Sequence, residues 1–510
     1  MMKLKKTKKW TLYVLVFLLI ISVASCFGVK SQIKQHTGEN TELVDSSLFN
    51  PAASPIAITN VSVLSSDCTK MLDSLTVLIK DEKIIQVAKE VSIPNEYIIV
   101  DATGQYLIPG LVDTHAHLHR SKNDLLLYLA NGVTHIANNS SESDNLLLTW
   151  REEAEKGALS PKIYIAAGGM SSKKGVIQKI KTLFGDSRKY NTSAQARRAV
   201  KKFKSQGYDA IKSYNPNREV YIALTNEAKK QNIPVIGHLP TDVSLEDLYS
   251  SGQSQLAHVE EIIKATIREF GGMWSDNSEE YLTFLKDNAD QIAVKLKKNK
   301  IVVSSTLWII ESIPKQNFEI DNFLKTIKLE YQNPGQIEGS KLAKGWLPGN
   351  NSYENMDIKN SPEQIKDHKL FWKTYVEAIH IMTKALVKQG VTITAGTDSN
   401  TPGVVAGFSL HDELESLSKS GLTEDQVLYA ATVAPSDWMH SNAGKIEIGR
   451  RADLVLLNKN PLGDIKNTRA INAVITKGKY LDRMTLDKIL ESIKLANNDS
   501  RKINIDKFIK

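Results

Sequence analysis

The feature that most constrains this chain is a pair of histidines after a short apolar strand in residues 107–117, LIPGLVDTHAH. Successive side chains of a β-strand point to opposite faces, so His115 and His117 lie on one face with the small Ala116 between them. Two imidazoles at one strand end supply half of the ligands of a typical metal site. Because the chain has 11 histidines, such a pair is weak evidence by itself. The interpretation therefore depends on finding the other ligands.

Residues 109–441 alternate strand-like and helix-like segments, which is typical of a parallel α/β fold. Helical patterns over 193–206 and 219–230 separate successive strands. Eight strand–helix units in roughly 330 residues predict a TIM (β/α)8 barrel with insertions. A polar stretch over 311–368 reads as one insertion. The predicted strands are 112–118, 133–138, 162–167, 210–213, 233–238, 255–258, 301–305 and 392–397.

Four further metal-ligand candidates stand where predicted barrel strands end. Lys212 lies near the end of the fourth strand, His238 ends the fifth, His258 the sixth, and Asp398 follows the eighth. Active sites of TIM barrels lie at the carboxyl ends of the strands. Any one of these residues alone is more often a structural or surface group. Their occurrence at strand ends around the barrel favours a metal site.

Two β-rich segments flank the predicted barrel. Strand patterns occur at 58–63, 75–79, 84–87 and 97–100 before it, and at 452–457 and 471–475 after it. Either group alone has too few strands to bury a two-sided core. We therefore expect residues 56–108 and 442–482 to form one small β-sandwich from both chain ends. Residues 483–510 are expected to form a C-terminal tail.

The N-terminus has the organisation of an export signal. Five lysines precede an apolar run over 10–24, and removing residues 1–25 lowers the formal net charge from +8 to +3. No basic stripe indicates a nucleic-acid partner. Val23-Ala24-Ser25-Cys26 resembles the bacterial lipobox, which implies lipidation of Cys26. The alternatives are an uncleaved anchor or ordinary cleavage near Ala24.

With this anchor, we expect an exported protein on the extracytoplasmic side of a bacterial membrane, at the outer membrane or in the periplasm if the cell is diderm. The polar residues 26–55 are expected to be a tether. Cys68 is then the second and last cysteine of the chain, and we expect it to be a buried small hydrophobe. A homo-oligomer is compatible with the sequence.

The ligand candidates and their surroundings resemble the amidohydrolase superfamily of metal-dependent hydrolases. The nearest likeness is to its imidazolonepropionase-like branch, which includes prolidase-like dipeptidases. The resemblance runs from about residue 56 to 482. Its motifs are PGLVDTHAH at 109–117, Ile211-Lys212, GTDS at 396–399, GLT at 421–423, GKI at 444–446 and GRRADLV at 449–455.

The resemblance implies one metal ion held by His115, His117 and Asp398, and a second held by His238 and His258. Lys212 matches the lysine that is N-carboxylated and bridges the two ions in binuclear relatives. Two Zn²⁺ ions are expected, with Mn²⁺, Co²⁺ or Fe²⁺ as alternatives. The ions lower the pKa of a shared water, which attacks the substrate carbonyl.

The same resemblance implies the proton chemistry and the substrate class. Asp398 is the implied general acid–base, which passes a proton to the leaving nitrogen. Tyr214 is a candidate donor to the substrate carbonyl, and His411 is a candidate substrate contact. The expected substrate carries an amide-like C–N bond, as in a dipeptide, an N-acyl amino acid or a cyclic amide. His135 departs from the pattern of the relatives, which leaves the substrate class open.

Two alternatives remain at this point. In the first, the same barrel is a mononuclear hydrolase or deaminase in which Lys212 is an ordinary amine. In the second, the chain is a surface binding lipoprotein that has lost catalysis. The presence of all five ligand types together with Lys212 argues against the second.

Overall fold

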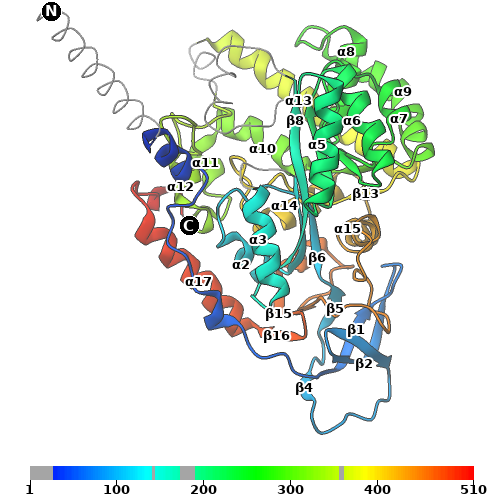
Figure 1. Cartoon of the computed structure of the whole chain (residues 1–510), viewed down its shortest axis with the longest axis vertical. Coiled ribbons are helices and arrows are strands. Elements are labelled where there is room, and N and C mark those ends of the chain that lie inside the picture. Colours follow the sequence, from blue (N-terminus) through cyan, green and yellow to red (C-terminus); the bar gives the residue numbers. More distant parts are fainter. Residues whose placement is uncertain (1–26, 140–143, 173–189, 355–360, 510) are drawn as a thin grey trace, which may run out of the picture.

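The computed structural model describes residues 27–139, 144–172, 190–354 and 361–509 (Figure 1). The predicted signal segment 1–25 and Cys26 therefore lie outside the described residues. Within the described ranges, no helix combines the length and apolar character needed to cross a bilayer.

The centre of the molecule is a parallel sheet of eight strands in sequential order, from β6 to β13. The first strand of this sheet, β6, is hydrogen-bonded to residues that follow the last strand, β13. There Thr114 N donates to Ala395 O at 2.9 Å, and Asp398 N donates to His115 O at 2.7 Å. The predicted TIM barrel and its eight strands are confirmed. The strands are β6 (Leu111–Ala116), β7 (Val133–Asn139), β8 (Lys162–Ser171), β9 (Ala210–Asn215), β10 (Val235–Gly237), β11 (Gln255–Ala257), β12 (Val302–Ser304) and β13 (Ile393–Thr394).

Helices between these strands cover the outside of the barrel. Their ends follow local sequence signals, as in α5, where Thr192 and Gln195 form a capping box, and in α6, where Asn217 caps the N-terminus. The long helices α9 and α13 pack on one another. The helices are α2 (Asp124–Ala130), α3 (Asp144–Glu155), α5 (Ser193–Ser205), α6 (Arg218–Lys230), α7 (Leu245–Ser251), α8 (Glu260–Phe270), α9 (Ser278–Lys298), α13 (Pro362–Lys388), α14 (Phe408–Lys419), α15 (Glu424–Ala431) and α16 (Val433–Trp438).

Both chain ends contribute to a second, mixed sheet, as predicted. Its order is β16-β15-β14-β5-β1-β2-β3, with β4 paired beside β1, and all of its strands belong to one hydrogen-bonded sheet. The two chain ends meet where β14 pairs antiparallel with β5, with Val455 opposite Ile108. The strands are β1 (Ile56–Leu64), β2 (Met71–Lys80), β3 (Lys83–Ala88), β4 (Ile98–Asp101), β5 (Tyr106–Pro109), β14 (Leu454–Leu457), β15 (Ile471–Thr476) and β16 (Lys479–Asp482).

Cys68 is 1% exposed, and burial raises the pKa of its thiol to about 11. It therefore has the environment of a buried small hydrophobe.

The polar insertion after β12 is largely helical. Most of α10 (Leu307–Phe318) is buried, and α11 (Ile320–Leu324), η2 (Leu329–Tyr331) and α12 (Pro334–Glu338) follow it. A chain segment without regular structure then runs to residue 354.

The segments expected to be a tether and a tail are both folded against the barrel. Thr37 and Thr41 are 3% and 6% exposed, and η1 (Ser46–Phe49) buries Phe49. In the C-terminal segment, α17 (Arg483–Ser500) packs on α2 and η2, and η5 (Asp506–Phe508) follows it. Some polar residues of the N-terminal segment make buried contacts, such as Thr41 with Asn333, and composition alone does not distinguish such a segment from a solvated linker.

Candidate metal centre

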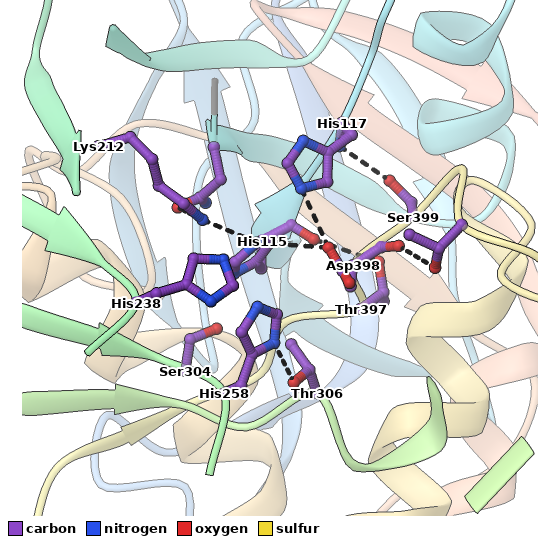
Figure 2. A network of polar contacts seen from close by, with 12 residues as sticks. His115, His117, Lys212, His238, His258, Ser304, Thr306, Thr397, Asp398 and Ser399 are labelled. Carbon is purple, nitrogen blue, oxygen red and sulfur yellow. Dashed lines mark hydrogen bonds and ion pairs between the residues drawn. The ribbon is translucent and has the colours of Figure 1, made fainter. Parts of the chain in front are cut away.

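The predicted ligands meet at the carboxyl ends of the barrel strands. In Figure 2 the rings of His117, His238 and His258 and the carboxylate of Asp398 surround His115, and the side chain of Lys212 reaches the same centre. His115 lies in β6 and Lys212 in β9, and the other four residues follow the ends of their strands. The barrel thus brings together residues separated by as many as 283 positions, from His115 to Asp398.

Asp398 is next to the histidine pair of β6. Its Oδ1 lies 3.0 Å from His117 Nε2 and 3.4 Å from His115 Nε2. Burial opposes ionisation of Asp398, but the hydrogen bond with His117 and the neighbouring His258 outweigh it and lower the pKa of the carboxyl below its usual range. An ionised carboxylate among imidazoles is a suitable ligand set for a divalent cation.

His238 and His258 form the other side of the centre. Their ring centroids are 4.9 Å apart, and the ring of His258 is 4.4 Å from that of His115. Burial, together with the charge of Lys212, holds the pKa values of His115 and His258 well below the ordinary histidine value. Neutral imidazoles keep a nitrogen lone pair for a metal ion.

These residues fit a divalent metal ion. His115, His258 and Asp398 each offer a ligand atom, and these atoms lie within 4.8 Å of one another. In addition, His115 Nδ1 is buried without a hydrogen-bond partner among the described residues. Such a group of buried nitrogen and carboxylate donors is costly without a cation to bind them. The donor types suit Zn²⁺ and neighbouring transition metals.

Lys212 is buried beside this centre, with its side chain almost fully enclosed. Its Nζ lies 3.3 Å from His115 Nε2 and 3.5 Å from Asn139 Oδ1. Burial lowers the pKa of the amine to about 8, although Asp398 and Glu261 oppose the shift. A larger fraction of this amine is therefore neutral near pH 7 than for a surface lysine.

A glycine makes room for this lysine. Gly237, at the end of β10, has φ +115°, and a Cβ there would lie 2.7 Å from Lys212 Cδ and 2.2 Å from Ser213 O. Only glycine fits both the backbone conformation and the space. The residue before the ligand His238 is therefore constrained by the lysine of the neighbouring strand.

Two side chains that the sequence analysis did not identify orient the histidines. His238 Nδ1 lies 2.9 Å from Glu261 Oε1, and His258 Nδ1 lies 2.7 Å from Thr306 Oγ1. Glu261 also accepts a hydrogen bond from Leu239 N at 3.1 Å. When Nδ1 of a histidine is engaged in this way, Nε2 is directed toward the metal.

The sequence contained only weak signals for these two partners. Glu261 is in the first turn of α8, where an acidic residue is common in any helix. Thr306 follows the predicted seventh strand directly, which is a position where barrel enzymes often place site residues. In the sequence, Glu261 and Thr306 cannot be told from residues that only stabilise the fold, because their histidine partners are known only from the structure.

Two of the ligands have unusual backbone conformations. His258 has φ +68° and Asp398 has φ +62°, in the left-handed region that most side chains avoid. Asp398 is held there by its amide hydrogen bond to His115 O. Such strain is typical of positions where function sets the direction of a side chain.

Of the two candidate substrate contacts, Tyr214 lies at the centre and His411 does not. Tyr214 lies beside the centre, with its ring 4.8 Å from that of His238 and the residue 51% exposed. His411 is not brought to the centre, because it is buried with Nδ1 2.9 Å from Thr468 Oγ1 and Nε2 3.1 Å from Asn131 O. Its position after the eighth strand was therefore a misleading signal.

His135 is also outside the group of ligands. Its Nε2 lies 3.7 Å from Asp453 Oδ2, next to the second sheet, and burial lowers its pKa to about 4. His135 therefore lies at the joint between the two sheets and not at the centre.

We predict that Glu261→Ala weakens zinc binding by about 10- to 100-fold, because His238 loses the partner that orients it. Competition with a zinc-binding dye measures the affinity. Glu260→Ala is the matched control, because Glu260 is the neighbouring carboxylate and pairs with Lys264 and Tyr375 instead of with a predicted ligand. Equal affinities of the two variants would contradict the orienting role of Glu261.

Part of the chain matches the profile of a known protein family. The profile described as "Amidohydrolase family" matches residues 106–481. Among curated proteins, human Dihydropyrimidinase-related protein 5 is 39% identical over 74 residues, which are 14% of this chain and 13% of that protein. This chain thus matches only a small part of that relative.

Solved structures match over most of their length. Bottromycin amidohydrolase has a TM-score of 0.68 at 21% identity, covering 91% of this chain and 96% of that one. A putative prolidase from Bifidobacterium longum has a TM-score of 0.58 at 21% identity, covering 87% and 100%. A Xaa-Pro dipeptidase with bound methionine has a TM-score of 0.58 at 15% identity, covering 84% and 100%. At these identities the likeness shows the fold.

Proposed function

The chain belongs to the amidohydrolase family, and on this premise we propose that it is a metal-dependent hydrolase that cleaves an amide-like C–N bond. The observation that carries the proposal is the convergence of four histidines, Asp398 and a buried lysine at one end of the barrel. Similar structures include a putative prolidase, a Xaa-Pro dipeptidase and an amidohydrolase, which supports a dipeptide as substrate. An N-acyl amino acid and a cyclic amide are the other candidates with an amide-like bond.

We assign His115, His117 and Asp398 to one cation and His238 and His258 to a second. Divalent cations such as Zn²⁺ supply Lewis acidity, which polarises a carbonyl and makes water a nucleophile near neutral pH. The anionic Asp398 and the four imidazoles provide the charge and lone pairs that hold such ions.

We further propose that Lys212 is carboxylated. Its neutral amine forms a bond to the carbon of CO₂ and releases a proton to solvent, which gives a carbamate whose single negative charge is shared by two oxygens. The lowered pKa of Lys212 supports this step, because only the neutral amine reacts. A carbamate would bridge two cations, whereas an ammonium would repel them.

The chain's own residues then handle the proton and the substrate. Asp398 takes a proton from the attacking water and returns it to the leaving nitrogen. Its place within 3.4 Å of two ligand nitrogens supports this role. Tyr214 is exposed beside His238 and directs a phenol toward the substrate carbonyl.

The direct test is metal analysis of the purified protein together with a screen of dipeptides, N-acyl amino acids and lactams. We expect two equivalents of metal per chain, and turnover of at least one of these classes that disappears with a chelator and returns with Zn²⁺. Metal-independent turnover, or a metal-free protein that resists loading, would contradict the proposal.

Lys212→Ala separates the binuclear mechanism from its alternative. We predict that this variant loses both metal and activity, because the bridge between the two cations is gone. Short-chain carboxylates should restore part of both by replacing the carbamate oxygens. Near wild-type activity with one metal per chain would instead establish the mononuclear hydrolase or deaminase.

Asp398→Asn should separate proton transfer from metal binding. The amide oxygen still coordinates a cation, and asparagine tolerates the left-handed backbone at this position. We predict that most of the metal remains, while turnover falls by about 10²- to 10⁴-fold because an amide does not carry the proton. Full activity of this variant would refute the assignment of Asp398 as the proton shuttle.

We also propose that the protein is exported and anchored by lipid at Cys26. The support is the sequence Val23–Cys26 after the apolar run. Cys26→Ser should then yield a protein without lipid at its N-terminus. Mass spectrometry of the native N-terminus tests this, and an unmodified mature N-terminus at another residue would exclude it.

A further inference from the structure

We propose that the N-terminal strap, residues 37–41, positions the metal ligand His117 through a chain of buried polar side chains. The inference rests on the proposed metal-binding function of His117. It means that the segment next to the proposed lipid anchor is part of the hydrolase site, rather than a spacer between membrane and enzyme.

The strap contacts the loop that follows His117 directly. Arg120 N, three residues after His117, donates to Thr37 O at 3.0 Å, and the Arg120 guanidinium pairs with Glu39. Thr37 and Thr41 are both buried. This strap is therefore an ordered neighbour of the ligand loop.

Asn333, in the insertion after β12, forms hydrogen bonds with two residues of the strap. Thr41 Oγ1 donates to Asn333 Oδ1 at 2.9 Å, and Asn333 Nδ2 donates to Gly38 O at 3.2 Å and to Ser121 Oγ at 3.1 Å. Gly38 has φ +87°, and a Cβ there would lie 2.6 Å from Asn333 Nδ2. The fit between strap and insertion therefore has no room for a methyl group.

From Ser121 the chain of contacts continues to the ligand. Ser121 Oγ donates to Asp124 Oδ1 at 2.7 Å. Asn400 Nδ2 lies 2.8 Å from Asp124 Oδ2 and 2.7 Å from His117 O, and donates to both. Asn400 is two residues after Asp398, so the same amide holds the loops that carry two of the proposed ligands together.

Every member of this chain of contacts is buried. Thr41, Ser121, Asp124, Asn333 and Asn400 are each at most 7% exposed. Loss of the Thr41 hydroxyl leaves Asn333 Oδ1 with one donor, Gly335 N at 2.9 Å, so the strap holds Asn333 less firmly and the neighbouring groups rearrange. Because metal affinity depends on ligand placement within about 0.5 Å, a rearrangement at Asn400 is expected to reach His117.

The test uses variants of the full-length mature protein. Thr41→Val removes the hydroxyl with little change of shape, and Thr41→Ser restores it. Gly38→Ala displaces Asn333 from the strap. The matched control is Gly28→Ala in the same N-terminal segment, where a Cβ would meet nothing within 4 Å. Two measurements are made on each protein: zinc affinity by dye competition, and amide hydrogen exchange of the peptide covering 113–122.

We expect Thr41→Val and Gly38→Ala to weaken zinc binding by about 2- to 30-fold. They should also speed amide exchange around residues 117–121, whereas Thr41→Ser and Gly28→Ala behave as wild type. A lower unfolding temperature with unchanged zinc affinity would show that the strap only stabilises the fold, and would overturn the proposal.

If the proposed metal-binding function is wrong, the experiment gives a different result. In that case the wild-type protein itself binds no zinc, and the exchange measurement decides alone. Faster exchange around His117 in Thr41→Val would still support the positioning role, and unchanged exchange would refute it.

Discussion

The contact between β6 and the end of β13 is the interaction on which the rest of the structure depends. Asp113 accepts hydrogen bonds from His115 N and Thr397 N, both at 3.1 Å, and from Thr397 Oγ1 at 2.6 Å. One buried carboxyl therefore joins the first and last strands of the barrel and brings His115 beside Asp398. Burial raises the pKa of Asp113 to about 7, although these hydrogen bonds oppose the shift. The fold therefore bears the free-energy cost of burying a carboxyl group at this position.

The second sheet secures the opposite end of the same strand. β5 leads through Gly110 directly into β6, and Gly110 N donates to Asp453 O at 2.8 Å. Asp453 is itself held by Arg451 at 2.8 Å and by Thr476 at 3.0 Å. The strand that carries the histidine pair is thus fixed at its start by the C-terminal half of the chain and at its end by β13. The second sheet, which both chain ends build, therefore supports the barrel although none of its strands belongs to the barrel.

The electrostatics of the centre follow from burial. Burial keeps His115 and His258 neutral and lowers the pKa of Lys212, while His117 and His258 beside Asp398 keep that carboxyl ionised. Neutral imidazoles and an ionised carboxylate are the protonation states in which these side chains bind a cation. Hydrogen bonds with Glu261, Thr306 and Asn400 then orient three of the ligands. Glu261 holds His238, Thr306 holds His258, and Asn400 holds the backbone of His117.

The eight strands and a second sheet built from both chain ends could be predicted from the sequence, and the family resemblance supplied the assignment of the residues at the centre. These features are local: apolar runs mark strands, His-x-His alternation sets a shared face, and a parallel barrel gathers strand ends whatever lies between them. The residues that support the centre can be identified only in the folded protein. Thr41 and Asn333 are 292 positions apart, and the sequence around each reads as an ordinary polar loop. The same limit explains His411, which has a suitable position in the chain but hydrogen-bonds to Thr468 and Asn131 instead. Strand patterns are encoded within a few residues, whereas a hydrogen-bond partner is chosen by the packing of the whole chain.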